Sequence, residues 1–109
     1  PLDDARFEDW AREARDRVRG RFVRAGVRAG ELALAAGEPD EAEGRAHGVL
    51  AAEPWSEGAY RVLVEAHLAR GDRGSALRAA ERCREMLADL GVTADALTGA
   101  LLRRVAAGP

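Results

Sequence analysis

Few residues in the sequence could perform catalytic chemistry. The side chains with nucleophilic potential are Cys83, Ser56, Ser75, Thr93 and Thr98. None stands in a nucleophile elbow, and the chain has no glycine-rich phosphate loop and no zinc motif. The hydroxyl groups fall where helix caps or surface positions are expected. The sequence therefore predicts no catalytic residue, no cofactor and no enzymatic activity.

Metal binding is also not expected. The two histidines, His47 and His67, are 20 residues apart on different predicted helices, and neither has a cysteine or a second histidine at ligand spacing. His67 belongs to an apolar helix pattern and is expected to be a packing residue with a polar tip. Cys83 also falls on an apolar helix face, which predicts a buried and unreactive thiol.

The elements that must position these residues are helical. The chain has 109 residues, among them 24 alanines and 17 arginines but no lysine, isoleucine, asparagine or glutamine, and its aromatic content is 5%. Alanine, leucine and arginine favour helices, whereas the residues that favour strands are scarce. No apolar stretch is long enough to span a membrane. The chain begins at Pro1 without a signal-peptide pattern, so we expect it to be part of a longer cytoplasmic protein.

Charge is distributed unevenly along a chain whose net charge is −2. Residues 1–30 sum to +2, residues 31–60 to −6 and residues 61–109 to +2, a balance that is not typical of a nucleic-acid-binding domain. One helix face carries a basic strip of Arg17, Arg21, Arg24 and Arg28. This strip is either a solvated face, partly paired through Glu13 and Arg17, or a contact surface for phosphate or for an acidic partner.

Apolar spacing predicts five helices separated by turns. A stripe from residue 7 to residue 36 has a helical period and predicts a long first helix over 4–36. Gly20, Gly26 and Gly30 interrupt this stripe, which indicates a bend, a break near Gly20 or close packing of a neighbouring helix. Further helices are expected over 39–52, 57–70, 72–90 and 94–106.

The last three of these helices have distinctive signals. The third is apolar around most of its circumference and should lie between neighbours, with Ser56 as its N-terminal cap. Along the fourth, alternating four- and three-residue steps define a packing seam of Ala76, Ala80, Cys83, Leu87 and Leu90. Thr93 is expected to begin the fifth helix.

The turn sequences at Gly37 and Gly71 resemble each other and are 34 residues apart, the length of a tetratricopeptide repeat. Helix pairs are therefore expected over 23–54 and 57–90. Because a stable array needs about three repeats, the first half of the long helix and the fifth helix should act as caps. The predicted fold is a single all-α domain over 1–109, with five to six helices in tetratricopeptide-like antiparallel pairs forming a right-handed superhelical array.

A wider pattern covers nearly the whole chain. Its elements are Phe7, Trp10 and Arg15, then Gly37 to Ala42, Glu53-Pro54 followed by Glu57, Gly71 with Ala76-Leu77, and Leu87 with Asp89-Leu90-Gly91. In this order they resemble the bacterial transcriptional activator domain of the Streptomyces antibiotic regulatory protein family. The chain departs from that pattern after Gly91 and has glycines at positions 44, 48 and 58 where helix formers are usual.

The resemblance implies a function and a class of partner. In such regulators the helical domain follows a winged-helix DNA-binding domain, so this chain would self-associate or contact the transcription machinery, with DNA bound only through a domain not present here. Self-association would give a homodimer, through the segment around Trp10 or through the seam of the fourth helix. No contact with a membrane is expected.

A partner surface is expected in the groove between the first helices of the two repeats. The positions that face away from the second helices are Arg24, Val27, Glu31, Leu34, Arg61, Glu65 and Leu68. Phe7 and Trp10 are expected to pack as an N-terminal cap or to anchor another domain. Two alternatives are a free-standing tetratricopeptide-type adaptor that binds a peptide and is unrelated to transcription, and direct DNA contact by the basic strip.

Overall fold

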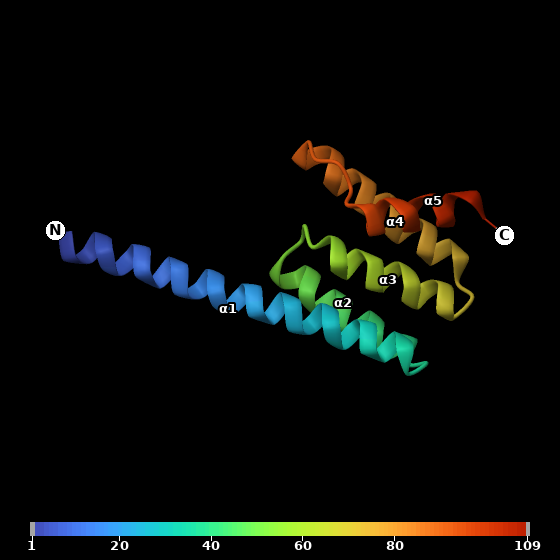
Figure 1. Cartoon of the computed structure of the whole chain (residues 1–109), viewed down its shortest axis with the longest axis horizontal. Helices are drawn as coiled ribbons and strands as arrows, with labels where there is room; N and C mark the ends of the chain where they lie inside the picture. Colours follow the sequence, from blue (N-terminus) through green and yellow to red (C-terminus); the bar gives the residue numbers. More distant parts are fainter. Residues whose placement is uncertain (1, 109) are drawn as a thin grey trace.

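The computed structural model of the chain describes residues 2–108, and every regular element in that range is an α-helix; Pro1 and Pro109 lie outside the described residues. The helices are α1 (Leu2–Ala35), α2 (Pro39–Ala52), α3 (Glu57–Ala69), α4 (Arg73–Leu90) and α5 (Ala96–Ala107). They form an elongated molecule of 61 × 32 × 19 Å, with the N-terminus at the free end of α1 (Figure 1). None of the described helices has the length and apolar character needed to cross a membrane.

Two turns with the same backbone geometry mark the repeat. After α1, the Gly37 amide donates to the Leu34 carbonyl, and the next amide donates to the carbonyl of Ala33. After α3, Gly71 donates to Leu68 and the following amide to His67 in the same way. Both glycines have a positive φ, 75° and 76°, the left-handed conformation that ends helices without a steric penalty. The two turns, 34 residues apart, therefore place α1 beside α2 and α3 beside α4 in tetratricopeptide-like pairs.

The C-terminal half of α1 packs closely because two of its glycines have no side chain. A Cβ atom on Gly26 would lie 2.4 Å from Val49 Cγ2 of α2, and one on Gly30 would lie 2.7 Å from Val62 Cγ1 of α3. Gly20 has no such neighbour except the flexible end of Arg24, and the helix continues through it. Of the three alternatives, close packing thus explains Gly26 and Gly30, and the helix has no break near Gly20.

α3 lies at the centre of the molecule and contacts every other helix. Its buried side chains meet buried residues of α2, α4 and α5, as the apolar circumference of this segment predicted. The largest fully buried side chains include Leu63, Val64, Val49, Val105 and Cys83. The seam of α4 is buried from Ala76 to Leu87, but Leu90 is 55% exposed, at the edge of a hollow that Trp55 and Tyr60 also line. The expectation that Leu90 belongs to the seam is wrong.

The N-termini of α3, α4 and α5 are capped by side chains that accept backbone hydrogen bonds. Ser56 accepts from the Ala59 amide at 3.2 Å, which confirms it as the cap of α3. Asp72 caps α4 by accepting from the Ser75 amide. Asp95 and not Thr93 caps α5, because the Asp95 carboxylate accepts from the amide of Thr98 at 2.9 Å. The fifth helix therefore begins later than Thr93.

The N-terminal half of α1 extends beyond the other helices, so the molecule has the form of a bundle with a protruding rod (Figure 1). Phe7 is 64% exposed and Trp10 is 59% exposed, and their rings contact each other with centroids 6.0 Å apart. This half of the helix covers no repeat. The expectations that it caps the array and that Phe7 and Trp10 pack within the chain are therefore wrong for the described residues.

Candidate functional site

The most prominent surface feature is an apolar stripe on the protruding half of α1. It consists of Phe7, Trp10, Ala14, Val18 and Phe22, and we call it the α1 stripe. Successive members are three or four residues apart, so they share one face of the helix. The four large side chains are all more than half exposed. A run of exposed aromatic side chains is typical of a protein contact surface.

Two hollows lie at the end of the α1 stripe nearest the bundle. One, of about 470 Å³, lies between Ala14, Val18 and Phe22 of α1 and Ala52 of α2. The other, of about 400 Å³, follows the seam between α1 and α2 and is bordered by Phe22 and by the glycines at positions 44 and 48. A Cβ atom on either of these two glycines would meet nothing within 4 Å, so the chain itself gives no packing reason for them.

The groove expected between the first helices is present as a hollow of about 290 Å³ between α1, α3 and α5. Glu31 and Leu34 form one wall, and Arg61 and Glu65 form another. The other three expected residues lie elsewhere. Arg24 is exposed, Val27 packs against the backbone of Gly58, and Leu68 borders a neighbouring hollow with Arg73 and Val105.

α5 supplies the wall of this groove that the sequence analysis missed. Leu97, Ala100, Leu101 and Arg104 line it. The groove side chains of α3 hold α5 in place, since Glu65 pairs with Arg104 and Arg61 donates to the Thr98 hydroxyl at 2.8 Å and to Asp95 at 3.1 Å. The 34-residue period could have indicated this wall, because Leu97 follows Leu63 by 34 positions.

The residues around Asp95 form a set of polar contacts that joins α3 to α5. The pKa of Asp95 lies below its ordinary value, chiefly because the Thr98 amide donates to the carboxylate, with further contributions from the Thr98 hydroxyl and Arg61. Thr98 is fully buried, which contradicts the surface or capping position expected for it. Arg61 and Thr98 therefore fix the groove wall.

The four arginines of the basic strip are all exposed on α1. Within the described residues, only Arg28 among them has an ion pair, with Glu31 at 3.9 Å, and the expected pair of Glu13 with Arg17 does not form. Arg17 and Arg21 flank the α1 stripe along one side by their helical positions. The strip thus presents uncompensated positive charge beside an apolar surface.

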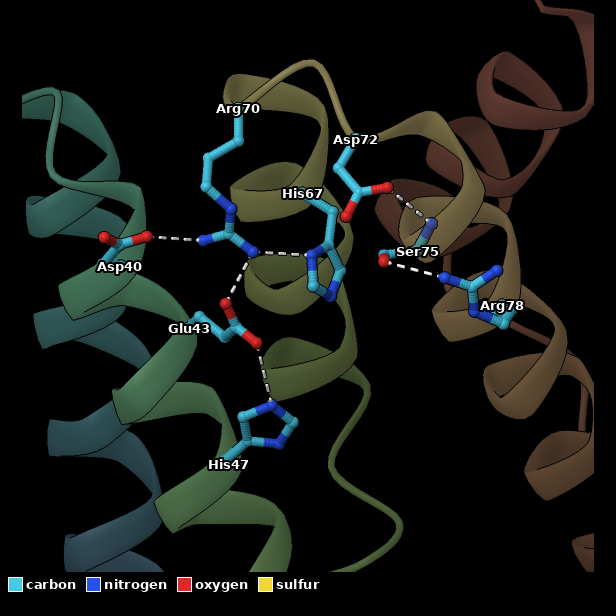
Figure 2. A network of polar contacts seen from close by, with 8 residues as sticks. All are labelled: Asp40, Glu43, His47, His67, Arg70, Asp72, Ser75 and Arg78. Carbon is cyan, nitrogen blue, oxygen red and sulfur yellow. Dashed lines mark hydrogen bonds and ion pairs between the residues drawn. The ribbon is translucent and has the colours of Figure 1, made fainter.

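A polar network joins α2 to the C-terminal end of α3 (Figure 2). Arg70 donates to Asp40 at 2.9 Å and to Glu43 at 2.6 Å, and its guanidinium lies 2.8 Å from His67 Nδ1. Glu43 also contacts His47 at 3.3 Å. On the far side of the turn, Figure 2 shows a separate contact chain through Asp72, Ser75 and Arg78.

The contacts in this network favour particular protonation states of His67 and Glu43. Burial lowers the pKa of His67, so the neutral ring with Nδ1 as the acceptor for Arg70 is favoured. For Glu43, burial raises the pKa, but hydrogen bonds from Arg70 and His47 outweigh it, and the pKa lies below its ordinary value. His67 is buried, as expected for a packing residue with a polar tip. The network therefore holds α2 against α3.

Two remaining groups considered for chemistry are structural. Burial raises the pKa of the Cys83 thiol to about 11, so the reactive thiolate is disfavoured at neutral pH, as predicted. Ser75 accepts a hydrogen bond from Arg78 at the start of α4. Among residues 2–108, no group of three or more histidine, cysteine or acidic side chains is arranged to hold a metal ion.

Paired antiparallel helices that repeat every 34 residues and present a groove and an exposed apolar face define a tetratricopeptide-like domain. A family model, the bacterial transcriptional activator domain, matches residues 1–106. The chain belongs to this family, which agrees with the resemblance found in the sequence. Comparison with curated proteins and with solved structures gives no significant match.

Proposed function

We propose that this domain regulates transcription through protein contacts, by self-association or by contact with the transcription machinery, and that it catalyses no reaction. The observation that supports the proposal most directly is the α1 stripe, whose aromatic residues lie on a helix that extends beyond its own bundle. Exposed aromatic side chains of this kind are enriched at protein interfaces. Membership of the activator domain family supports a role for such a contact in transcription rather than in an unrelated adaptor.

The groove between α1, α3 and α5 is a second proposed contact surface. Its floor is apolar, and Glu31, Glu65 and Arg61 stand at its edge. Because Arg61 and Glu65 already bind α5, a partner there would meet a preformed wall. We further propose that the regulator contacts DNA through a different domain, since the chain has a net charge of −2.

Reporter fusions test this function in two arms. In the first, the chain is fused to a DNA-binding domain that represses only as a dimer, so repression reports self-association. In the second, it is fused to a constitutively dimeric DNA-binding domain upstream of a weak promoter, so activation reports contact with the transcription machinery. We expect at least one arm to respond, and we expect Trp10→Ala to abolish the response.

Trp55 provides a matched control, because it is 50% exposed but lies between α2 and α3, outside the α1 stripe. Trp55→Ala should leave the response intact. A response in neither arm, with folded fusion protein present, would contradict the proposed function. Steep loss of duplex DNA binding with added salt by the chain alone would instead favour the basic strip as a DNA contact.

A further inference from the structure

We propose that the α1 stripe binds the same segment of a second copy, with the two helices antiparallel and crossing at Ala14. This inference rests on the proposed function and names the partner of the stripe. It follows from three properties of the protruding half of α1: the order of its side chains, the order of its charges, and the hollows at its base.

The order of side chains gives the stripe a two-fold centre. Ala14 is its middle member, and it is small enough to let two helix backbones approach. With Ala14 on the axis, Trp10 lies opposite Val18 of the second copy, and Phe7 lies opposite Phe22. Each large side chain therefore meets a large side chain, and the same surface serves both copies, as a closed dimer requires.

The order of charges selects the antiparallel orientation. Residues 3–9 contain four acids and one arginine, whereas residues 17–28 contain five arginines and no acid. An antiparallel pair places the acidic segment of each copy beside the basic segment of the other, while a parallel pair would place like charges together. Arg21 and Arg24 of the basic strip would then face the acidic end of the second copy.

One charge pair is well defined by position. Asp3 and Arg24 are 21 residues apart, almost six helical turns, so they lie within about 60° of each other on the same side of the α1 stripe. In an antiparallel two-fold pair each side of the helix meets the same side of its mate. Asp3 of one copy therefore lies near Arg24 of the other, and this contact occurs twice.

The surface at the base of the rod can receive the incoming helix. Phe7 of the second copy would reach Phe22, between the hollow lined by Ala52 and the one lined by Gly44 and Gly48. The absence of side chains at these two glycines leaves the seam open to a helix. Six half-exposed aromatic rings would bury roughly 600 Å², and alanine, valine and arginine stems can supply the rest of the roughly 1,000 Å² of a specific interface.

Sedimentation equilibrium of the full chain tests the assembly, over about 1–500 µM to span weak dimers. We expect a monomer–dimer equilibrium whose Kd rises by at least roughly thirtyfold in Trp10→Ala, as for a central aromatic contact, and is unchanged in Trp55→Ala. Circular dichroism should show that both variants remain helical. A monomer over the whole range would overturn the inference.

Charge reversal tests the orientation. Asp3→Arg and Arg24→Asp should each weaken dimerisation by about tenfold at low salt, and the difference should shrink as salt is added. Combining both changes in one chain should restore the dimer, and mixing the two single variants should give a heterodimer. Additive weakening in the double variant would overturn the antiparallel arrangement.

Disulfide trapping tests the register independently of charge. A mixture of Ala11→Cys and Val18→Cys chains should form a mixed disulfide dimer, because these positions lie opposite one another across Ala14. Cys83 is buried and should not interfere. Efficient self-linking of Ala11→Cys alone would indicate a parallel pair and overturn the inference. A monomeric chain that still activates the reporter through Trp10 would refute this assembly but not the proposed function.

Discussion

The two halves of α1 belong to one continuous helix but differ in the size and the exposure of their apolar side chains. From Val23 onward the helix packs on α2 and α3, and glycines 26 and 30 let it approach them closely. Up to Phe22 the helix carries larger side chains, and none of the other helices covers them. In the buried half small residues permit contact within the chain, and in the protruding half large residues remain available for contact between chains.

This comparison shows that an apolar helical period does not indicate whether the helix that packs against it belongs to the same chain or to another chain. The period continues through both halves, yet only one half has a neighbour in its own chain. Residue size distinguishes them better, because two helices in one repeat can approach closely only through glycine and alanine. The following experiments compare the two halves of α1 or test the surface that one of them contacts.

The largest effect is expected from adding a side chain to the buried half. Gly30→Leu should lower the free energy of unfolding by about 3 kcal/mol, because its Cβ would fall 2.7 Å from Val62 Cγ1 in a packed core. The same change at Gly44, where a Cβ meets nothing within 4 Å, should raise it by roughly 0.8 kcal/mol. Urea titration in dilute solution measures both, and equal stability changes would contradict the assigned packing.

The two valines on either side of the boundary allow the same truncation in both halves. Val23 is 9% exposed and Val18 is 61% exposed. Val23→Ala should lower the free energy of unfolding by roughly 2 kcal/mol, through the loss of two buried methyl groups and the space they leave. Val18→Ala should change it by less than about 0.5 kcal/mol. Thermal or urea unfolding of dilute protein provides the comparison, and a larger loss at Val18 would show that the stripe is covered within the chain.

Hydrogen exchange should detect the same boundary without mutation. Amides of residues 24–35 should exchange only on opening of the bundle, whereas those of residues 5–15 should exchange far faster in dilute solution, because no other helix supports them. Mass spectrometry of peptic fragments resolves the two segments. Equal protection of both segments at low concentration would contradict the comparison.

The smallest effect concerns the network that holds α2 against α3, the surface on which the buried half of α1 rests. The pKa of His67 is lower in the folded state, so its contribution to stability is present above the ordinary histidine pKa of about 6.5 and is lost as the pH falls through the lower, folded value. The protein should be slightly less stable at pH 5 than at pH 7.5. In His67→Phe this loss should be reduced, with His47→Phe as the control, when melting temperatures are compared at the two pH values.

Much of the fold could be predicted because its determinants are local. The glycines at 37, 71 and 91 end helices through a left-handed conformation that other residues rarely adopt, and Ser56 caps α3. The start of α5 was misjudged because Thr93 and Asp95 are both good capping residues, and only the tertiary contacts of Asp95 with Arg61 and Glu57 favour the second. The sequence left open whether α1 breaks at Gly20, and the helix continues there, since a glycine costs a helix only about 1 kcal/mol.

The candidate site was harder to predict, because the exposure of its side chains depends on where the neighbouring helices end. Leu90 continues the period of α4 but is more than half exposed. Trp10 continues the period of α1 in the same way. Arg24 and Val27 do not line the groove as predicted, whereas Leu97 of α5 does. The reason is that a residue far along the sequence closes the groove. Periodicity describes a face, whereas exposure is set by the lengths of all the helices together.

Because α1 is continuous, the rotation of the α1 stripe about the helix axis, relative to the bundle, is fixed. Each residue of a helix turns the chain by about 100°, so the direction in which the α1 stripe points is set by the number of residues between it and Gly26. Deleting one residue near Arg21 would rotate the stripe by more than a quarter turn about the rod while leaving its composition intact. Adding seven residues would preserve the direction and move the stripe about 10 Å outward. The number of residues between the two halves therefore determines the direction of the α1 stripe, just as residue identity determines its composition.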